Sequence, residues 1–251
     1  MPVSSVQYGQ VPWFYTNGLQ LSNDSVAPDT IIRCSTGSTL DSTGVYQIEV
    51  TAALEADISV SGINGLDTGT VAASTVYNVF LIADPVSLEP DALLISLSAT
   101  QPLMPFNYSV FKRIGYIVTD GTSDILLGYW SAGNSATRQF TFDAPILALN
   151  AGTQTSYTGV ALTTFVPAVD NTPVVIYSDF TANAAADIEN LQGFDSTGDA
   201  VTIIAPVAGA TAHTTSQNTV LAQLNTAAPS IKYKVSAGSL SLYVCGYTFY
   251  L

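Results

Sequence analysis

Short runs in which apolar and polar residues alternate predict β-strands along much of the chain. Val45–Val50 and Ile58–Ile63 alternate with a period of two, which places successive side chains on opposite faces of a strand. Thr75–Ile82 starts with the same alternation and ends in a continuous apolar run, as expected of a strand that is buried on both faces. Ala92–Ser98 follows after a connection that contains two prolines. We expect it to form a hairpin with Thr75–Ile82.

A second hairpin is predicted between Phe111–Val118 and Ile125–Trp130. Asp120–Ser123 joins the two runs and has the composition of a tight turn, with Asp and Gly adjacent. Strands at this spacing, separated by turns rich in Gly, Pro and Asn, are typical of a sandwich or a barrel.

The second half carries further strand signals after a small-residue polar stretch, Ser131–Thr137. These signals lie at Phe140–Phe142, Thr158–Val166, Pro173–Phe180, Ala200–Ile204 and Lys232–Leu251. The pattern predicts an all-β protein with two antiparallel β-sandwich (jelly-roll-like) domains in tandem. We place the N-terminal domain at residues 1–140 and the C-terminal domain at residues 141–251.

Helix signals are few. Ala182–Leu191 has local helix propensity, and Thr219–Leu224 has the length of one helical turn. In a β context we interpret both as loops between strands.

Composition narrows the class of protein. Charged residues make up 10% of the chain, well below the about 25% of an average soluble domain. Short neutral polar residues therefore solvate the surface, which is typical of extracellular and viral β proteins. The net charge of −13, with six Lys and Arg in all, disfavours binding to nucleic acid and to an anionic bilayer. A basic partner or a neutral glycan is compatible with it.

The chain's opening residues have neither the basic nor the apolar region of a signal peptide. We therefore expect synthesis in a host cytoplasm without export by the usual signal. A protein of this surface type that is released by cell lysis fits a component of the virion exterior.

Two cysteines, Cys34 and Cys245, lie near opposite ends of the chain. Two thiols do not by themselves supply a disulfide framework or a zinc site. Cys245 lies in the apolar pattern of Leu240–Leu251, so we expect it to be buried. A bridge between Cys34 and Cys245 stays open.

Candidate chemistry is limited to one histidine and a few pairs of carboxylates. His213 lies in a polar stretch without a nucleophile motif, so we interpret it as an exposed loop residue. The close acidic pairs are Glu55 with Asp57, Glu89 with Asp91, and Asp187 with Glu189. Glu55 and Asp57 share one face of a strand and could form a glycosidase pair, but surface charge is the favoured interpretation of all three. We expect no enzymatic activity, no catalytic residue, no cofactor and no metal.

Aromatic residues gather near both ends of the chain. They can anchor an interface or stack on sugars, although strand aromatics more often pack in a core. Our interface candidates are Trp13, Phe14, Tyr15, Tyr247, Phe249 and Tyr250.

Several short motifs in the first half occur in a fixed order. They are Phe14–Asp24, Pro28–Ile32, Gly37–Thr43, Gly65–Gly69, Tyr77–Ile82, Pro105–Tyr108, Phe111–Tyr116 and Thr119–Gly121. Over about residues 13–130 this set resembles a module of structural proteins from tailed phages and prophages. The resemblance implies a virion protein of the tail-fibre or tail-appendage type. It supplies no catalytic motif, and the second half matches no family that we can name.

Three functional hypotheses follow. The leading one is a non-enzymatic structural protein on the exterior of a tailed-phage virion, a tail-fibre or appendage subunit. Its alternatives are a capsid decoration (cement or head-fibre) protein and a module that binds host surface glycan. We expect other virion proteins as partners, and a homo-oligomer with a trimer favoured. Because the sequence has no coiled-coil heptads, that trimer would associate through β surfaces.

Overall fold

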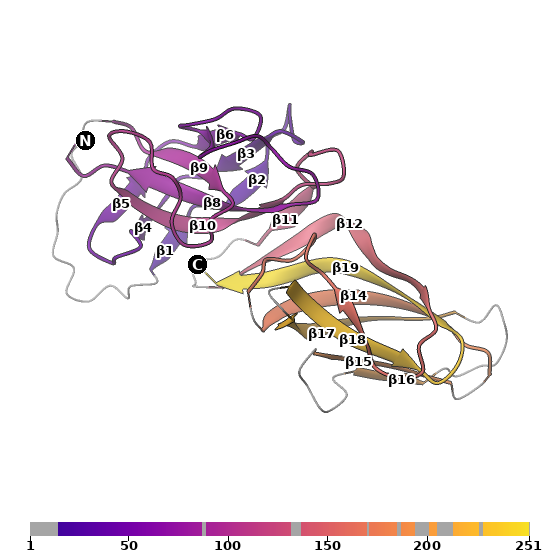
Figure 1. Ribbon diagram of the computed structural model, residues 1–251. Helices are drawn as coiled ribbons and strands as arrows, with labels where there is room; N and C mark the ends of the chain where they lie inside the picture. Colours follow the sequence, from indigo (N-terminus) through magenta and orange to yellow (C-terminus); the bar gives the residue numbers. More distant parts are fainter. Residues whose placement is uncertain are drawn as a thin grey trace. The chain divides into compact units, whose positions relative to one another are not determined.

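Every regular element in the described part of the computed structural model is a β-strand (Figure 1), which confirms the all-β prediction. The structure describes residues 15–86, 89–131, 137–169, 171–184, 187–193, 201–204, 213–225 and 228–250. These residues divide into two compact units. Unit 1 takes in the described residues of Met1–Phe140 and Phe249–Leu251, and unit 2 those of Thr141–Thr248.

Unit 1 contains three small sheets. Its strands are β1 (Thr16–Gly18), β2 (Leu21–Asn23), β3 (Ile31–Cys34), β4 (Gly37–Leu40), β5 (Gln47–Val50), β6 (Leu54–Asp57), β7 (Gly65–Leu66), β8 (Val76–Ala83), β9 (Ala92–Ser96), β10 (Val110–Val118) and β11 (Gly128–Trp130). The sheets have the strand orders β1-β4-β5, β2-β3-β6 and β10-β8-β9-β7. All pairs in them are antiparallel except β7 with β9.

Unit 2 is built on one large sheet. Its strands are β12 (Thr137–Gly152), β13 (Thr158–Ala161), β14 (Thr172–Thr181), β15 (Ile188–Gly193), β16 (Val201–Ile204), β17 (His213–Asn225), β18 (Ala228–Val235) and β19 (Ser239–Tyr250). They follow the order β12-β19-β14-β17-β18-β15-β16, and β13 pairs with β18. The division between the two units falls within β12 and within β19.

The predicted hairpin of β8 and β9 is present. The two strands pair antiparallel, from Asn78 opposite Ser96 to Ile82 opposite Ala92. All of β9 and nearly all of β8 are buried, because neighbours cover both faces, as the continuous apolar runs predict. One end of the pair forms a core cluster of Phe80, Ile82, Ala92, Leu94 and Tyr108, against which Met104 and Phe111 pack.

The second predicted hairpin is only partly present. β10 pairs along its length with β8, and the segment after the turn meets it at one bridge, between Thr119 and Ile125. The N–H of Ile125 donates to the carbonyl of Asp29, 2.6 Å away, and the N–H of Gly128 to Oδ1 of Asn23 at 3.2 Å. Because Asp29 and the last residue of β2 accept from these donors, the segment leaves β10, and β11 pairs with β12 instead.

Ile58–Ile63 is a turn and not the predicted strand. Oδ1 of Asp57 accepts from the N–H of Ser59 (2.8 Å), and Gly62 has a φ of 98°. The bond from Asp57 turns the chain where β6 ends, and the left-handed backbone of Gly62 interrupts the alternating stretch itself.

Both weak helix signals fall on or beside strands. Thr219–Leu224 lies inside β17, which pairs with β14 over ten residue pairs, so its interpretation as a loop is wrong. The end of Ala182–Leu191 belongs to β15, which pairs with β18 and β16. Tertiary pairing overrides the small differences in local propensity here.

Both cysteines are free thiols, so Cys34 and Cys245 do not form a bridge. Cys245 is buried, as predicted. Cys34 is completely buried on β3, and burial raises the pKa of its thiol to about 12.

Candidate functional site

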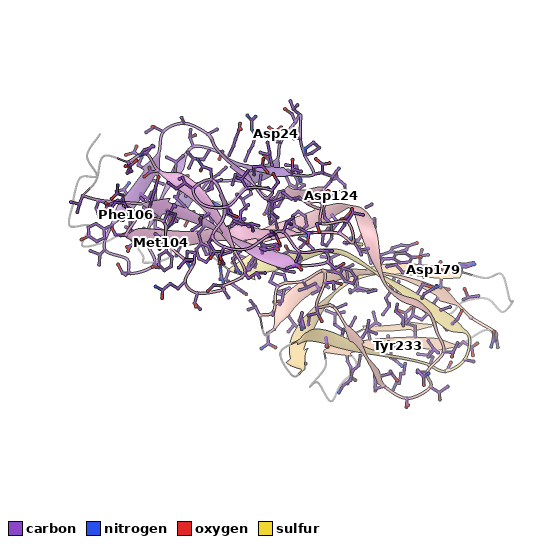
Figure 2. All side chains as sticks on the ribbon, turned by 45° about the horizontal axis from the view of Figure 1, so that its top comes forward. Asp24, Met104, Phe106, Asp124, Asp179 and Tyr233 are labelled. Atoms are coloured by element: carbon purple, nitrogen blue, oxygen red, sulfur yellow. The ribbon has the colours of Figure 1, made fainter. Side chains whose placement is uncertain are left out.

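The outward side of strand β14 combines aromatic, acidic and hydroxyl side chains. The strand alternates between buried and half-buried residues along its whole length. Tyr177, Asp179 and Thr181 therefore share the half-buried outward side, while Ser178 and Phe180 point inward and are fully buried. Asp179 is labelled in Figure 2.

The strands on either side of β14 extend this surface. In the β14–β17 register, Thr181 lies opposite His213, Asp179 opposite Thr215, and Tyr177 opposite Gln217. In the β14–β19 register, Asp179 lies opposite Ser241 and Tyr177 opposite Tyr243. Because directly opposite residues point to the same side of a sheet, these eight residues form one surface, which we call the Tyr177 face.

Two contacts organise the Tyr177 face. The rings of Tyr177 and Tyr243 pack with their centroids 5.8 Å apart and their planes inclined by 56°. Nδ1 of His213 lies 2.7 Å from Oδ1 of Asp179 and 3.4 Å from Oγ1 of Thr181. The side chains of His213 and Asp179 are 55% and 30% exposed. The histidine is exposed as predicted, but it is the first residue of β17 and not a loop residue.

Ser178, which follows Tyr177 and precedes Asp179 in the strand, does not join Asp179 and His213 in a catalytic triad. Ser178 points into unit 2, whereas Asp179 and His213 lie on the outward side of the sheet. The face instead offers partly exposed aromatic rings, a carboxylate, an imidazole, an amide and hydroxyls. These groups can stack on a ligand and exchange hydrogen bonds with it.

The buried side of the same strands holds a second polar cluster. Oγ of Ser178 donates to Oε2 of Glu189 at 3.2 Å and lies 2.9 Å from Oγ of Ser216. Glu189 is fully buried, and burial raises the pKa of its carboxyl to about 7. Among the described residues, Oε1 of Glu189 has no hydrogen-bond partner. The interpretation of Glu189 as surface charge in a loop is therefore wrong, because β15 carries it into the interior.

Asp187, the sequence neighbour of Glu189, has a local structural role. Its Oδ2 accepts from the backbone N–H groups of Asn183 (2.9 Å) and Ala184 (2.7 Å). These bonds hold the backbone of Asn183 and Ala184 close to the residue that precedes β15.

The pair of Glu55 and Asp57 takes part in structural contacts on β6. Oε1 of Glu55 accepts from Nε of Arg33 at 2.9 Å, and Arg33 also lies 3.0 Å from Asp24. Asp57 bonds to Ser59 in the turn that follows. Each carboxylate is thus committed to a neighbour in its own part of unit 1.

Glu89 and Asp91 flank Pro90 before β9. Oε1 of Glu89 accepts from Nδ2 of Asn107 at 3.3 Å. Burial raises the pKa of the Asp91 carboxyl.

The described residues contain no group of three or more His, Cys, Asp or Glu that is able to hold a metal ion. No helix among them is long and apolar enough to cross a bilayer.

Of the six aromatic interface candidates, Trp13 and Phe14 lie outside the described residues. Tyr15 and Tyr250 are exposed, at 37% and 58%. Both are therefore accessible to a partner in this structure.

Tyr247 and Phe249 are buried and pack within the chain. The ring of Phe249 lies 5.2 Å from that of Tyr116, nearly perpendicular to it, and the ring of Tyr247 lies 6.2 Å from that of Phe142. With these edge-on contacts both residues belong to the core of the chain. The prediction that they are interface residues is therefore wrong. Phe249 belongs to unit 1, as does Tyr116, whereas the sequence predicted it in the second domain.

Comparison with known proteins does not identify a family for this chain. No family model matches the chain, and no curated protein matches it. Among solved structures, a carbohydrate-binding module of Cellvibrio mixtus lichenase 5A in complex with cellotriose is similar over 50% of this chain and 87% of its own length, with 14% identity and a TM-score of 0.24. A structure of infectious bursal disease virus, Gx strain, is similar over 94% of this chain and 71% of its own, with 14% identity and a TM-score of 0.21. At such low scores these similarities carry no functional argument.

Proposed function

We propose that the chain is a non-enzymatic structural protein on the exterior of a tailed-phage virion, a tail-fibre or tail-appendage subunit. The supporting observation is that the motifs on which the resemblance to the phage module rests are structural parts of unit 1. Tyr77–Ile82 lies in β8 and Phe111–Tyr116 in β10, and these two strands pair with each other. The role of these motifs is therefore structural, because their residues build paired strands.

Two further motifs support the same framework. Oδ2 of Asp67 accepts from Oγ of Ser96 at 2.6 Å and from the N–H of Leu103 at 2.9 Å, so it fixes the connection after β9. Oδ1 of Asp120 accepts from the N–H groups of Thr122 and Asp124, which closes the turn after β10.

A capsid decoration protein is the alternative place in a virion. Copy number separates the two, because decoration requires hundreds of copies whereas a tail position requires about six to eighteen. Quantitative mass spectrometry of purified particles, with the major capsid protein as the standard, makes this measurement. Absence of the chain from the particle would contradict both places.

The second candidate function is binding of host surface glycan at the Tyr177 face. Tyr177 and Tyr243 offer ring surface for stacking on a pyranose, and Asp179, His213 and Gln217 supply acceptors and donors for its hydroxyls. The net charge of −13 favours a neutral sugar over an acidic one. A glycan array probed with the full chain tests this function, and the expected result is binding confined to neutral glycans.

A further inference from the structure

Phe106 is the most exposed large apolar side chain among the described residues, at 91%. It lies in the four-residue turn Pro105–Tyr108, where the N–H of Tyr108 donates to the carbonyl of Pro105 at 3.2 Å. Asn107 takes a φ of 69°, a conformation that Asn tolerates better than most residues. The turn places Phe106 at its tip, away from the core.

The residues on both sides of Phe106 are fixed. Met104 packs against the core cluster of unit 1, and Tyr108 is a buried member of that cluster. Figure 2 labels Met104 and Phe106. Oη of Tyr108 also donates to the carbonyl of Pro90 at 2.8 Å. The tip is therefore held in one conformation before any partner arrives, which lowers the entropic cost of binding through it.

The connection between β8 and β9 lies against this turn and supplies negative charge. Oδ1 of Asp84 accepts from Oγ of Ser109 at 2.9 Å, and Oε1 of Glu89 accepts from Asn107. Val86, in the same connection, is 89% exposed. We call the set Asp84, Val86, Glu89, Asp91, Leu103 and Phe106 the Phe106 surface. Its described connections, residues 84–86, 89–91 and 103–109, contain three carboxylates and no Lys or Arg.

We propose that the Phe106 surface docks a second protein, different from this chain, that offers an apolar pocket rimmed by Lys or Arg. A fixed, exposed aromatic side chain is the type of residue that dominates binding energy at protein interfaces. Carboxylates beside it select a partner of positive potential and repel an anionic membrane.

A second copy of the chain lacks such a rim. Four of its six basic residues are engaged or buried within the chain: Arg33 bonds to Glu55, Lys112 and Arg138 are buried, and Arg113 donates to the carbonyls of Ala99 and Tyr250. The other two, Lys232 and Lys234, lie on β18 and also interact within the chain; Nζ of Lys234 lies 4.3 Å from the centre of the Tyr157 ring.

Photo-crosslinking tests this proposal. Phe106 is replaced by the photoreactive p-benzoylphenylalanine in the full-length chain, in cells that produce it, and the cross-linked peptide is identified by mass spectrometry. Val26 is the matched control position, because it is also 89% exposed and lies in unit 1. We expect one dominant product with a different protein, joined at an apolar segment that Lys or Arg flanks. That product is absent with the probe at position 26, and its yield falls severalfold when lysates are irradiated at high salt.

Four results would overturn the proposal. They are a cross-link to a second copy, a cross-link to lipid, the same products from positions 26 and 106, and no product from position 106. The thermal unfolding midpoint of Phe106→Ser, expected to match that of the unsubstituted chain, shows that the tip has no role in folding. The cross-link reports binding at Phe106 whether or not the chain is part of a particle. The docking surface and the virion function can therefore fail independently, because only the analysis of purified particles tests the second.

Discussion

Ser178 donates a hydrogen bond to Glu189 across the interior of unit 2, with 3.2 Å between Oγ and Oε2. Ser178 comes from β14 and Glu189 from β15, and these strands are not neighbours in the sheet. One serine hydroxyl is poor compensation for burying a carboxylate. This explains why the pKa of Glu189 rises to about 7 and why its acid form is the one that the fold favours.

The first prediction concerns stability and pH. Because the pKa of Glu189 is higher in the folded chain than its ordinary value of 4.5, the folded state holds a proton that the unfolded state has lost between these values. The contribution to the free energy of unfolding is therefore fully present below about pH 4.5 and is lost as the pH rises through about 7, by about 3 kcal/mol in all.

Urea unfolding of the full chain at several pH values from 5 to 8 measures this effect. Glu189→Gln keeps the shape of the side chain and cannot ionise, so its stability should fall less over the same range. Parallel curves for the two proteins would mean that Glu189 does not titrate near neutral pH.

The second prediction concerns Arg138, a buried guanidinium at the start of β12. Its two terminal nitrogens donate to the carbonyls of Gly18 and Leu19, both of which have left-handed backbone conformations. Arg138→Met leaves these carbonyls without their donors and should lower the free energy of unfolding by about 3 kcal/mol. Arg33→Met is the control, because the side chains of Arg33 and its partner Glu55 are 43% and 49% exposed, and loss of such an ion pair should cost less than about 1 kcal/mol. An equal decrease in the free energy of unfolding in both variants would contradict a larger structural role for Arg138 than for Arg33.

A third prediction follows from the buried thiols Cys34 and Cys245. In the native chain neither should react readily with a disulfide reagent at pH 8, and both should react once the chain is unfolded in guanidinium. A reductant should leave the thermal unfolding midpoint unchanged. A midpoint that falls on reduction would reveal a disulfide.

The fourth prediction concerns the Tyr177 face. If a neutral glycan stacks there, Tyr177→Ala and Tyr243→Ala should each weaken its binding about tenfold, in line with the loss of one aromatic contact of about 1 kcal/mol or slightly more. Tyr129→Ala serves as the control, since Tyr129 is exposed on β11 of unit 1. Isothermal titration with the best ligand from the array measures all three. If only Tyr129→Ala lost affinity, the glycan would bind to unit 1 and not to the Tyr177 face of unit 2.

Runs of apolar residues in the sequence identify some of the strands correctly. Thr75–Ile82 and Pro173–Phe180 both contain such a run, and both fall on strands in the structure. β17 was missed because its first residues, from His213 to Asn218, are all polar, and only their pairing with β14 defines them as a strand.

The residues of the candidate site needed the register as well as the strands. Tyr177 and Tyr243 become neighbours only through the pairing of β14 with β19. Glu189 resembles surface charge in the sequence because it follows a segment of small residues and pairs with Asp187. Its burial depends on packing between distant strands. Local pattern carries no information on either relationship.

The most direct test of a virion role is a cryo-electron microscopy map of the intact particle at a resolution that traces strands. We expect density for both β units on the exterior of the tail, in about six to eighteen symmetry-related copies. Density on the capsid surface in hundreds of copies would select the decoration alternative. A particle without this chain, or one that holds it in the interior, would contradict a place on the virion exterior.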